Sequence, residues 1–285
     1  MKAEIRICSL LPSTTEIVCE LGLQKNLVGI THECDYPSEI LDVQVVTKSL
    51  IDHTGSTSSQ INTHISEALH KGSGIYAIDN EALSRVDPTM ILTQELCEVC
   101  AVSYTLVEES VRTLGGDQKI LSFEPSNLAG ILDSILQIGK QTNTKSKASE
   151  IVDQSHSRLD FVKSESLKSP KTPRVLGLEW LDPPFIGGHW VPEMIEIAGG
   201  TPALGKREEP SRQVSWEEVS KSSPEIIVLM VCGFDLARTI EEFDLLKESD
   251  FWKQYDGEIY AVDGLSLIHI SEPTRRYAIG GGGGG

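Results

Sequence analysis

The stretch Val175-Leu-Gly-Leu-Glu-Trp-Leu-Asp-Pro-Pro-Phe-Ile-Gly-Gly-His-Trp-Val-Pro-Glu-Met-Ile-Glu-Ile-Ala-Gly-Gly200 decides how the second half of the chain folds. Its apolar start predicts a strand, its prolines and glycines predict a loop, and the apolar residues that follow have helical spacing up to the final glycines. Loops after the carboxyl ends of strands face the ligand crevice in an open α/β sheet. The residues expected to face a ligand here are Glu179, Trp180, His189 and Trp190. Trp180 taken alone fits a core-capping role equally well.

The length and composition of the chain predict a globular protein with two lobes. A chain of 285 residues is long enough for two lobes that each bury a core. The hydrophobic fraction of 39% is ordinary, and no apolar run reaches the roughly 20 residues that a membrane helix needs. The net charge of -17 would repel a phosphate backbone, so we expect no nucleic-acid partner.

The N-terminal residues and the cysteines bear on the cellular location. The apolar stretch from Ile5 to Leu11 is interrupted by Arg6 and stopped by Pro12, which makes it too short for the core of a signal peptide. Without an export signal, the chain as written is expected to be cytoplasmic. The 6 cysteines therefore predict reduced thiols rather than a disulfide framework.

The end of the chain differs in character from the rest. Leu265-Ser-Leu-Ile-His-Ile-Ser-Glu-Pro-Thr-Arg275 resembles the translation of a transposase adapter used to prepare sequencing libraries, and a run of glycines from Gly280 to Gly285 follows it. By composition this tail has no apolar face and no turn residues that lead to another element. We therefore expect residues 265–285 to be a non-native tail, and the native fold to be cut short near Gly264.

Residues 1–125 alternate strands and helices, which predicts an N-terminal α/β lobe with a parallel sheet and helices on both faces. After a first strand from Ile5 to Leu11, Ser13-Thr-Thr-Glu16 matches a capping box that opens a helix ending at Gly22. Further strands are expected at 27–30, 43–46, 75–78, 90–93 and 119–123, with helices before Gly72 and at 79–86 and 102–114.

Residues 126–168 are wholly helical in pattern. Apolar residues keep helical spacing from Leu128 to Leu136 and resume it at Ala148, after the polar Thr142-Asn-Thr144. About 40 residues of helix would span about 60 Å, which suits a rigid connector between two lobes. Alternation returns over 169–264, with strands expected at 174–179, 226–230 and 259–262 and helices at 191–198, 216–220 and 236–246. The expected fold class is therefore α/β, with two Rossmann-like lobes joined by a long α-helix.

Polar residues also follow other predicted strands, in Thr31–Pro37, Thr93–Cys100 and Val231–Asp235. We expect these loops to converge with 179–190 on one crevice between the lobes. Cys97 and Cys100, at CxxC spacing, fit a soft-metal site with His32 and Cys34, a redox pair, or two buried thiols without a partner, and the last is the commonest case. Neither a phosphate-binding glycine motif nor a nucleophile elbow is present, which favours binding over catalysis.

Three segments make the chain resemble a known family. They are Arg6-Ile-Cys-Ser-Leu-Leu-Pro-Ser-Thr-Thr-Glu-Ile17, His32-Glu-Cys-Asp-Tyr-Pro37, and Asp182-Pro-Pro-Phe185 with Gly187 and Gly188. The chain resembles, over residues 4–264, the ABC-transporter substrate-binding proteins of the cobalamin and iron-siderophore class. The resemblance implies two α/β lobes joined by one long helix, a ligand held between them and delivered to a membrane permease, and a periplasmic or surface-anchored protein.

The resemblance also implies roles for single residues. Glu81 and Glu217 match the glutamates that dock onto permease arginines in the cobalamin-binding members, although a glutamate at a helix start is favoured in any protein. Gln94 stands where the cobalamin-binding members carry a tryptophan, which is a departure from the family pattern.

We therefore expect a non-enzymatic, monomeric binding protein for cobalamin or a related corrinoid or metal chelate, with no resident cofactor. The aromatic residues expected to pack on the ligand are Tyr36, Trp180, Phe185 and Trp190. The residues expected to make polar contacts are Asp35, Gln94, Glu179 and His189. The alternative is an intracellular thiol- or metal-dependent enzyme that uses His32, Cys34, Cys97, Cys100 and His189.

Overall fold

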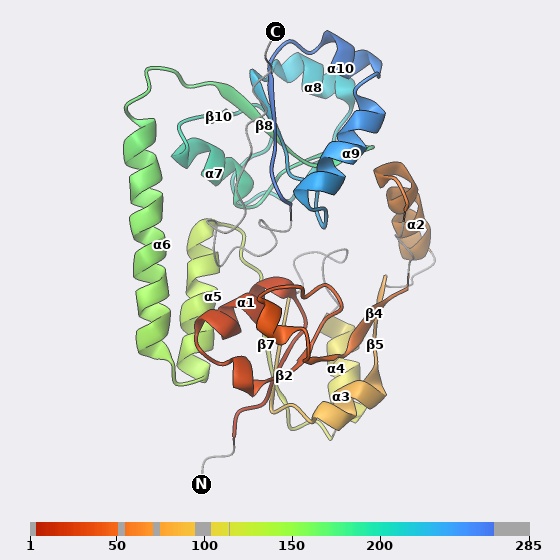
Figure 1. Ribbon diagram of the computed structural model, residues 1–285, viewed down its shortest axis with the longest axis vertical. Coiled ribbons are helices and arrows are strands. Elements are labelled where there is room, and N and C mark those ends of the chain that lie inside the picture. The colour runs from red at the N-terminus through yellow and green to blue at the C-terminus, as the bar shows by residue number, and fades with distance from the viewer. Residues whose placement is uncertain (1–3, 51–54, 71–74, 95–103, 114, 265–285) are drawn as a thin grey trace. The chain divides into compact units, whose positions relative to one another are not determined.

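The computed structural model describes residues 4–50, 55–70, 75–94, 104–113 and 115–264 (Figure 1). Their contacts divide the chain into two compact units. Unit 1 contains the residues up to Ser56, Thr63–Pro125 and Leu132–Val152, and unit 2 contains Thr57–Asn62, Ser126–Ile131 and the residues from Asp153 onward. The predicted α/β class with two lobes is confirmed, while the predicted tail 265–285 lies outside the described residues.

Unit 1 is built on a parallel sheet in the order β3-β2-β1-β6-β7. Its strands are β1 (Ile7–Ser9), β2 (Leu27–Ile30), β3 (Gln44–Val45), β6 (Met90–Thr93) and β7 (Lys119–Ser122). Side chains alternate across β1, so Ile7 packs into one core cluster and Cys8 into another.

The two core clusters explain the helices on both faces of this sheet. The cluster of Ile7 includes residues of α1 (Pro12–Glu20), α5 (Leu128–Gln141) and α6 (Lys145–Ser166). The cluster of Cys8 includes residues of α3 (Asn80–Val86) and α4 (Tyr104–Thr113). The prediction of a parallel sheet covered on both faces is therefore correct for unit 1.

Two local predictions for unit 1 are wrong. Helix α1 begins at Pro12 without a side-chain cap, so Ser13-Thr-Thr-Glu16 is not a capping box. Proline suits the first helical position because it has no N–H to satisfy and its φ is already helical. Strand β5 (Tyr76–Ile78) is not in the parallel sheet, because it pairs antiparallel with β4 (Thr47–Ser49), a strand that the pattern does not predict.

The segment 126–168 forms two helices, α5 and α6, rather than one. Asn143 has a left-handed backbone with φ of 63°, and the Thr144 N–H donates to the Gly139 carbonyl at 2.8 Å. This hydrogen bond is typical of a Schellman helix end. A Cβ on Gly139 would lie 2.4 Å from the Ala148 Cβ, so glycine allows the two helices to approach closely beyond the turn (Figure 1). The 22 residues of α6, about 33 Å of helix, pass from unit 1 into unit 2.

Unit 2 is built on a mixed sheet in the order β11-β9-β8-β12-β13, with β10 also paired to β8. The strands are β8 (Arg174–Leu181), β9 (Pro184–Ile186), β10 (Thr201–Pro202), β11 (Arg212–Gln213), β12 (Ile226–Leu229) and β13 (Glu258–Ala261). β10, β12 and β13 run parallel to β8, whereas β9 runs antiparallel to it. Leu176, Leu178 and Ile227 are fully buried, so β8 and β12 form the centre of this core.

Helices α7 (Val191–Ile197), α8 (Trp216–Ser222) and α9 (Leu236–Leu246) of unit 2 match the predictions within a few residues. Helix α10 (Asp250–Gln254) was too short to give a helical period in the sequence. Its Trp252 is 6% exposed and meets the rings of Trp216, Phe243 and Phe251 edge-on at 5.0–5.2 Å. None of the helices in the described residues is long and apolar enough to cross a membrane.

Candidate functional site

The predicted ligand-facing segment 179–190 begins as a β-hairpin. The prolines in this segment predict a loop, yet β8 runs on to Leu181 and β9 returns antiparallel from Pro184. Pro184 is tolerated because it is the first residue of β9. Leu178 pairs with Ile186 and Trp180 pairs with Phe185, so Glu179 is an extra residue on β8. A β-bulge of this kind re-aims the side chains around it.

Trp180 is held inside unit 2 by two contacts. Its indole N–H donates to the Ser58 carbonyl at 3.2 Å, and its ring lies 5.4 Å from that of the buried Phe234. Ser58 is the first residue of α2 (Ser58–His70). The structure therefore supports the core-capping role for part of Trp180, and the indole nitrogen is already used.

His189 and Trp190 follow the hairpin as a pair of neighbouring rings. Their centroids lie 5.8 Å apart, and both residues are partly buried. His189 has a φ of 51°, which is uncommon for a residue other than glycine. Its Nδ1 is buried and has no hydrogen-bond partner among the described residues. Burial lowers the pKa of His189, so the ring is neutral near pH 7 and offers an unused nitrogen.

A segment of residues 205–211, which we call the crossing loop, passes next to Gly188 and His189. The His189 N–H donates to the Glu209 carbonyl at 2.7 Å, and the Glu208 N–H donates to the His189 carbonyl at 3.0 Å. A Cβ on Gly188 would lie 2.2 Å from the Ser211 nitrogen. Glycine at 188 is therefore required for the crossing loop to pass.

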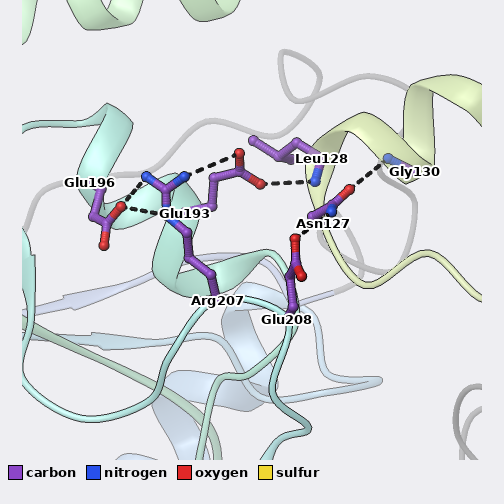
Figure 2. A network of polar contacts seen from close by, with 7 residues as sticks. All are labelled: Asn127, Leu128, Gly130, Glu193, Glu196, Arg207 and Glu208. Atoms are coloured by element: carbon purple, nitrogen blue, oxygen red, sulfur yellow. Dashed lines mark hydrogen bonds and ion pairs between the residues drawn. The ribbon is translucent and has the colours of Figure 1, made fainter.

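The crossing loop is tied to α7 by charge. The Arg207 guanidinium donates to the Glu196 carboxylate, and it lies 3.7 Å from the Glu193 carboxylate (Figure 2). Glu193 and Glu196 are one helical turn apart on α7, so one arginine reaches both carboxylates.

The crossing loop is also tied to the start of α5. The Glu208 carboxylate accepts a hydrogen bond from the Asn127 side-chain nitrogen at 2.7 Å (Figure 2). The Asn127 side-chain oxygen accepts from the Gly130 N–H at 2.8 Å, and Glu193 accepts from the Leu128 N–H at 3.0 Å. These residues could not be predicted from the sequence, because contacts between distant segments leave no characteristic spacing.

The candidate residues of unit 1 lie at one edge of its sheet. Asp35 and Tyr36 follow β2, and Gln94 directly follows β6. Both strands are parallel to β1, so their carboxyl ends meet at the same edge. Asp35 is exposed, and Tyr36 and Gln94 are partly buried.

His32 and Cys34 each lie next to a threonine hydroxyl in the described structure. Cys34 is 7% exposed, and its sulfur lies 3.1 Å from the Thr15 hydroxyl and 3.3 Å from the Thr31 hydroxyl. Burial raises the pKa of the Cys34 thiol, which keeps it protonated. The His32 Nδ1 lies 2.7 Å from the Thr47 hydroxyl. Within the part of the chain that the structure describes, no three His, Cys, Asp or Glu side chains are grouped to hold a metal.

Cys97 and Cys100 lie outside the described residues, so the CxxC part of the thiol and metal prediction stays a prediction. The two glutamates expected to contact a permease are described. Glu81 and Glu217 are exposed in the first turns of α3 and α8. Glu217 pairs with Lys221 at 2.6 Å on the same helix.

Comparison with known proteins identifies the class of protein that this fold and site define. Residues 7–256 match the family model described as periplasmic binding protein, and the chain therefore belongs to that family. The expected family is thereby confirmed. Its members are binding proteins, which supports the prediction of a non-enzyme at the level of the family. The family name does not support the cytoplasmic location expected from the N-terminal residues.

Individual relatives agree with this assignment. The high-affinity heme uptake system protein IsdE of Staphylococcus aureus is 24% identical over 139 residues, and the match covers 47% of this chain and 47% of IsdE. The chain thus matches about half the length of this curated relative.

Solved structures match the fold over a larger share of the chain. IsdE of Staphylococcus aureus complexed with heme has a TM-score of 0.66 at 17% identity, covering 94% of this chain and 95% of that one. The vitamin B12 binding protein BtuF of Vibrio cholerae has a TM-score of 0.62 at 19% identity, covering 93% and 95%. A possible iron-binding protein of Staphylococcus epidermidis has a TM-score of 0.67 at 19% identity, covering 94% and 93%. At these identities the comparison shows the shared fold.

Proposed function

We propose that this chain is the substrate-binding component of an ABC transporter and that it binds cobalamin or a related corrinoid or metal chelate. The observation that carries the proposal is the pair of His189 and Trp190 in unit 2. A large flat chelate needs aromatic surface and a few polar groups that fix its orientation. Trp190 offers a partly buried indole, and His189 offers a neutral ring with an unused nitrogen.

Further ligand contacts are proposed from residues of each lobe. From unit 2, Phe185 and the indole ring of Trp180 would add apolar surface to the ligand site. Glu179 at the β-bulge would add a polar contact. From unit 1, the residues proposed to contact the ligand are Asp35, Tyr36 and Gln94. The vitamin B12 protein BtuF and the heme complex of IsdE support this class of ligand, because both share the fold.

Delivery to a membrane permease is the second part of the proposal. Glu81 and Glu217 would dock onto permease arginines, and the protein would act as a monomer outside the cytoplasm. Both carboxylates are exposed, as docking requires. Ala substitutions at these two positions should reduce transport into vesicles that contain the cognate permease while leaving ligand affinity unchanged. Glu150→Ala, at an exposed glutamate on α6, is the matched control and should change neither quantity.

Gel filtration after incubation with hydroxocobalamin, hemin or a ferric siderophore tests the ligand class. We expect hydroxocobalamin to elute with the protein at a one-to-one ratio, and we expect His189→Ala to lose it. Retention of none of the three would contradict the proposed ligand class, and retention of only hemin or only the siderophore would contradict cobalamin as the ligand.

A further inference from the structure

We propose that Glu208 is a positioning residue for His189, acting through the crossing loop. The interpretation of His189 as a ligand contact rests on the proposed function. The positioning itself is a property of the protein without ligand and can be tested without one. Arg207 and Asn127 take part as the partners that fix the crossing loop.

The backbone contact between His189 and the crossing loop joins two residues that both have an unusual backbone conformation. His189 has a φ of 51° and Glu208 has a φ of 66°, so two residues with side chains adopt the left-handed conformation and face each other. A left-handed backbone is strained for a residue with a side chain, so each such residue persists only when its surroundings impose it. The hydrogen bonds on either side of the His189 peptide, at 2.7 and 3.0 Å, supply part of that constraint.

The side chains of the crossing loop supply the rest of the constraint. The Glu209 N–H donates to the Lys206 carbonyl at 3.2 Å, so Arg207 and Glu208 are the central residues of a tight turn. Their side chains extend from the loop to separate anchors, Arg207 to α7 and Glu208 to Asn127 (Figure 2). The turn that hydrogen-bonds to the His189 backbone is therefore held in place by the side chains of both of its central residues.

The conformation of His189 decides where its ring lies. The direction of a Cα–Cβ bond follows from φ and ψ, so a return of His189 to a right-handed or extended backbone would move the imidazole. The ring would then lose the buried position next to Trp190. Glu208 thus controls the His189 side chain without any contact to it that the structure describes.

Nuclear magnetic resonance of the ligand-free protein tests this inference. We would measure the pKa of His189 from its ring protons and the exchange rate of its backbone amide in wild type, Glu208→Ala and Glu208→Gln. Loss of the carboxylate alone would lower the pKa of His189, because a negative charge is removed. Release of the ring to solvent would raise that pKa toward 6.5, the ordinary value. A rise therefore reports loss of position and not loss of charge.

We expect Glu208→Ala to raise the pKa of His189 and to speed exchange of its amide about tenfold. Glu208→Gln retains a side-chain oxygen for Asn127 and should restore both values. Lys206→Ala is the matched control, because Lys206 belongs to the same turn but pairs only with the exposed Glu209 in the described structure. Glu208→Gly, which tolerates the left-handed backbone, replaces Glu208→Ala if the latter does not fold.

An unchanged pKa and exchange rate in Glu208→Ala or Glu208→Gly would overturn the positioning role. Equal effects of Lys206→Ala and Glu208→Ala would overturn it as well. Hydroxocobalamin titration of the same proteins separates this result from the ligand. If the pKa responds as expected but wild type does not bind hydroxocobalamin, Glu208 remains a positioning residue and the proposed ligand fails.

Discussion

Glu242 accepts a hydrogen bond at 2.9 Å from the backbone N–H of Ser58, which lies 184 residues earlier in the chain. The Ser58 hydroxyl donates to the same carboxylate oxygen. Ser58 is 0% exposed and Glu242 is 6% exposed. A carboxylate of α9 therefore satisfies an N–H in the first turn of α2, which has no partner within its own helix. This contact explains why the first turn of α2 belongs to unit 2.

Glu242→Ala should lower the free energy of unfolding by about 2–3 kcal/mol, because it leaves two buried donors of Ser58 without an acceptor. Urea denaturation measures the change. Glu241→Ala, at the exposed neighbouring position, should stay within about 0.5 kcal/mol of wild type. Ser58→Ala in the Glu242→Ala background should then add less destabilisation than it does alone. Fully additive effects would show that the two side chains do not interact.

Trp190→Ala should weaken binding of hydroxocobalamin by about 2 kcal/mol or more, because the indole supplies flat contact area. Its effect on stability should be smaller than the effect of Trp252→Ala. Trp252 lies in the aromatic core of unit 2, where such a truncation costs about 3–5 kcal/mol. Calorimetric binding and denaturant unfolding on both variants measure the two effects. Unchanged affinity in Trp190→Ala, together with a large stability loss, would make Trp190 a core residue.

The sequence predicted the elements whose period is long enough to detect. Alternating strands and helices identified both lobes, and the helical spacing in 126–168 was real. The break in that segment was missed because Asn143 ends α5 through its backbone conformation, and a single polar residue does not force that conformation.

The candidate site was only partly predictable. The aromatic and polar residues of segment 179–190 gave His189 and Trp190 as candidate ligand contacts, but its prolines predicted a loop where strand β9 forms. The residues that fix the crossing loop come from three distant segments, so their proximity depends on tertiary packing. No local pattern links Asn127 to Glu208, or Ser58 to Glu242.

Stability should depend on pH through His189. Burial lowers the pKa of His189 below 6.5 in the folded state. Between that lower value and pH 6.5, the unfolded chain therefore binds more protons than the folded protein does. The stability that His189 contributes is present above about pH 6.5 and is lost as the pH falls through the folded-state pKa. Compared with His189→Gln, wild type should lose more unfolding free energy between pH 7.5 and pH 5. His156→Gln, at an exposed histidine of α6, is the control, and a wild-type profile parallel to that of His189→Gln would refute the prediction.

Cys34 should resist alkylation at pH 8. The thiolate is the reactive form of cysteine, and burial raises the pKa of the Cys34 thiol. The Cys34 side chain is also only 7% exposed, so a reagent has little access to it. The partly buried Cys232 should react with iodoacetamide sooner than Cys34, as measured by mass spectrometry of the labelled peptides. Labelling of Cys34 as fast as Cys232 would contradict this prediction and favour the interpretation of Cys34 as a reactive thiol.

Isothermal titration of hydroxocobalamin into wild type, His189→Ala and Trp190→Ala tests the central claim most directly. We predict one-to-one binding to wild type and at least about tenfold weaker binding to each variant, since each variant loses one contact of about 1.4 kcal/mol or more. Hemin and a ferric siderophore serve as competitors in the same cell. Saturable binding of hydroxocobalamin that is equal in all three proteins, or no binding to wild type, would contradict the assignment of a corrinoid site to His189 and Trp190.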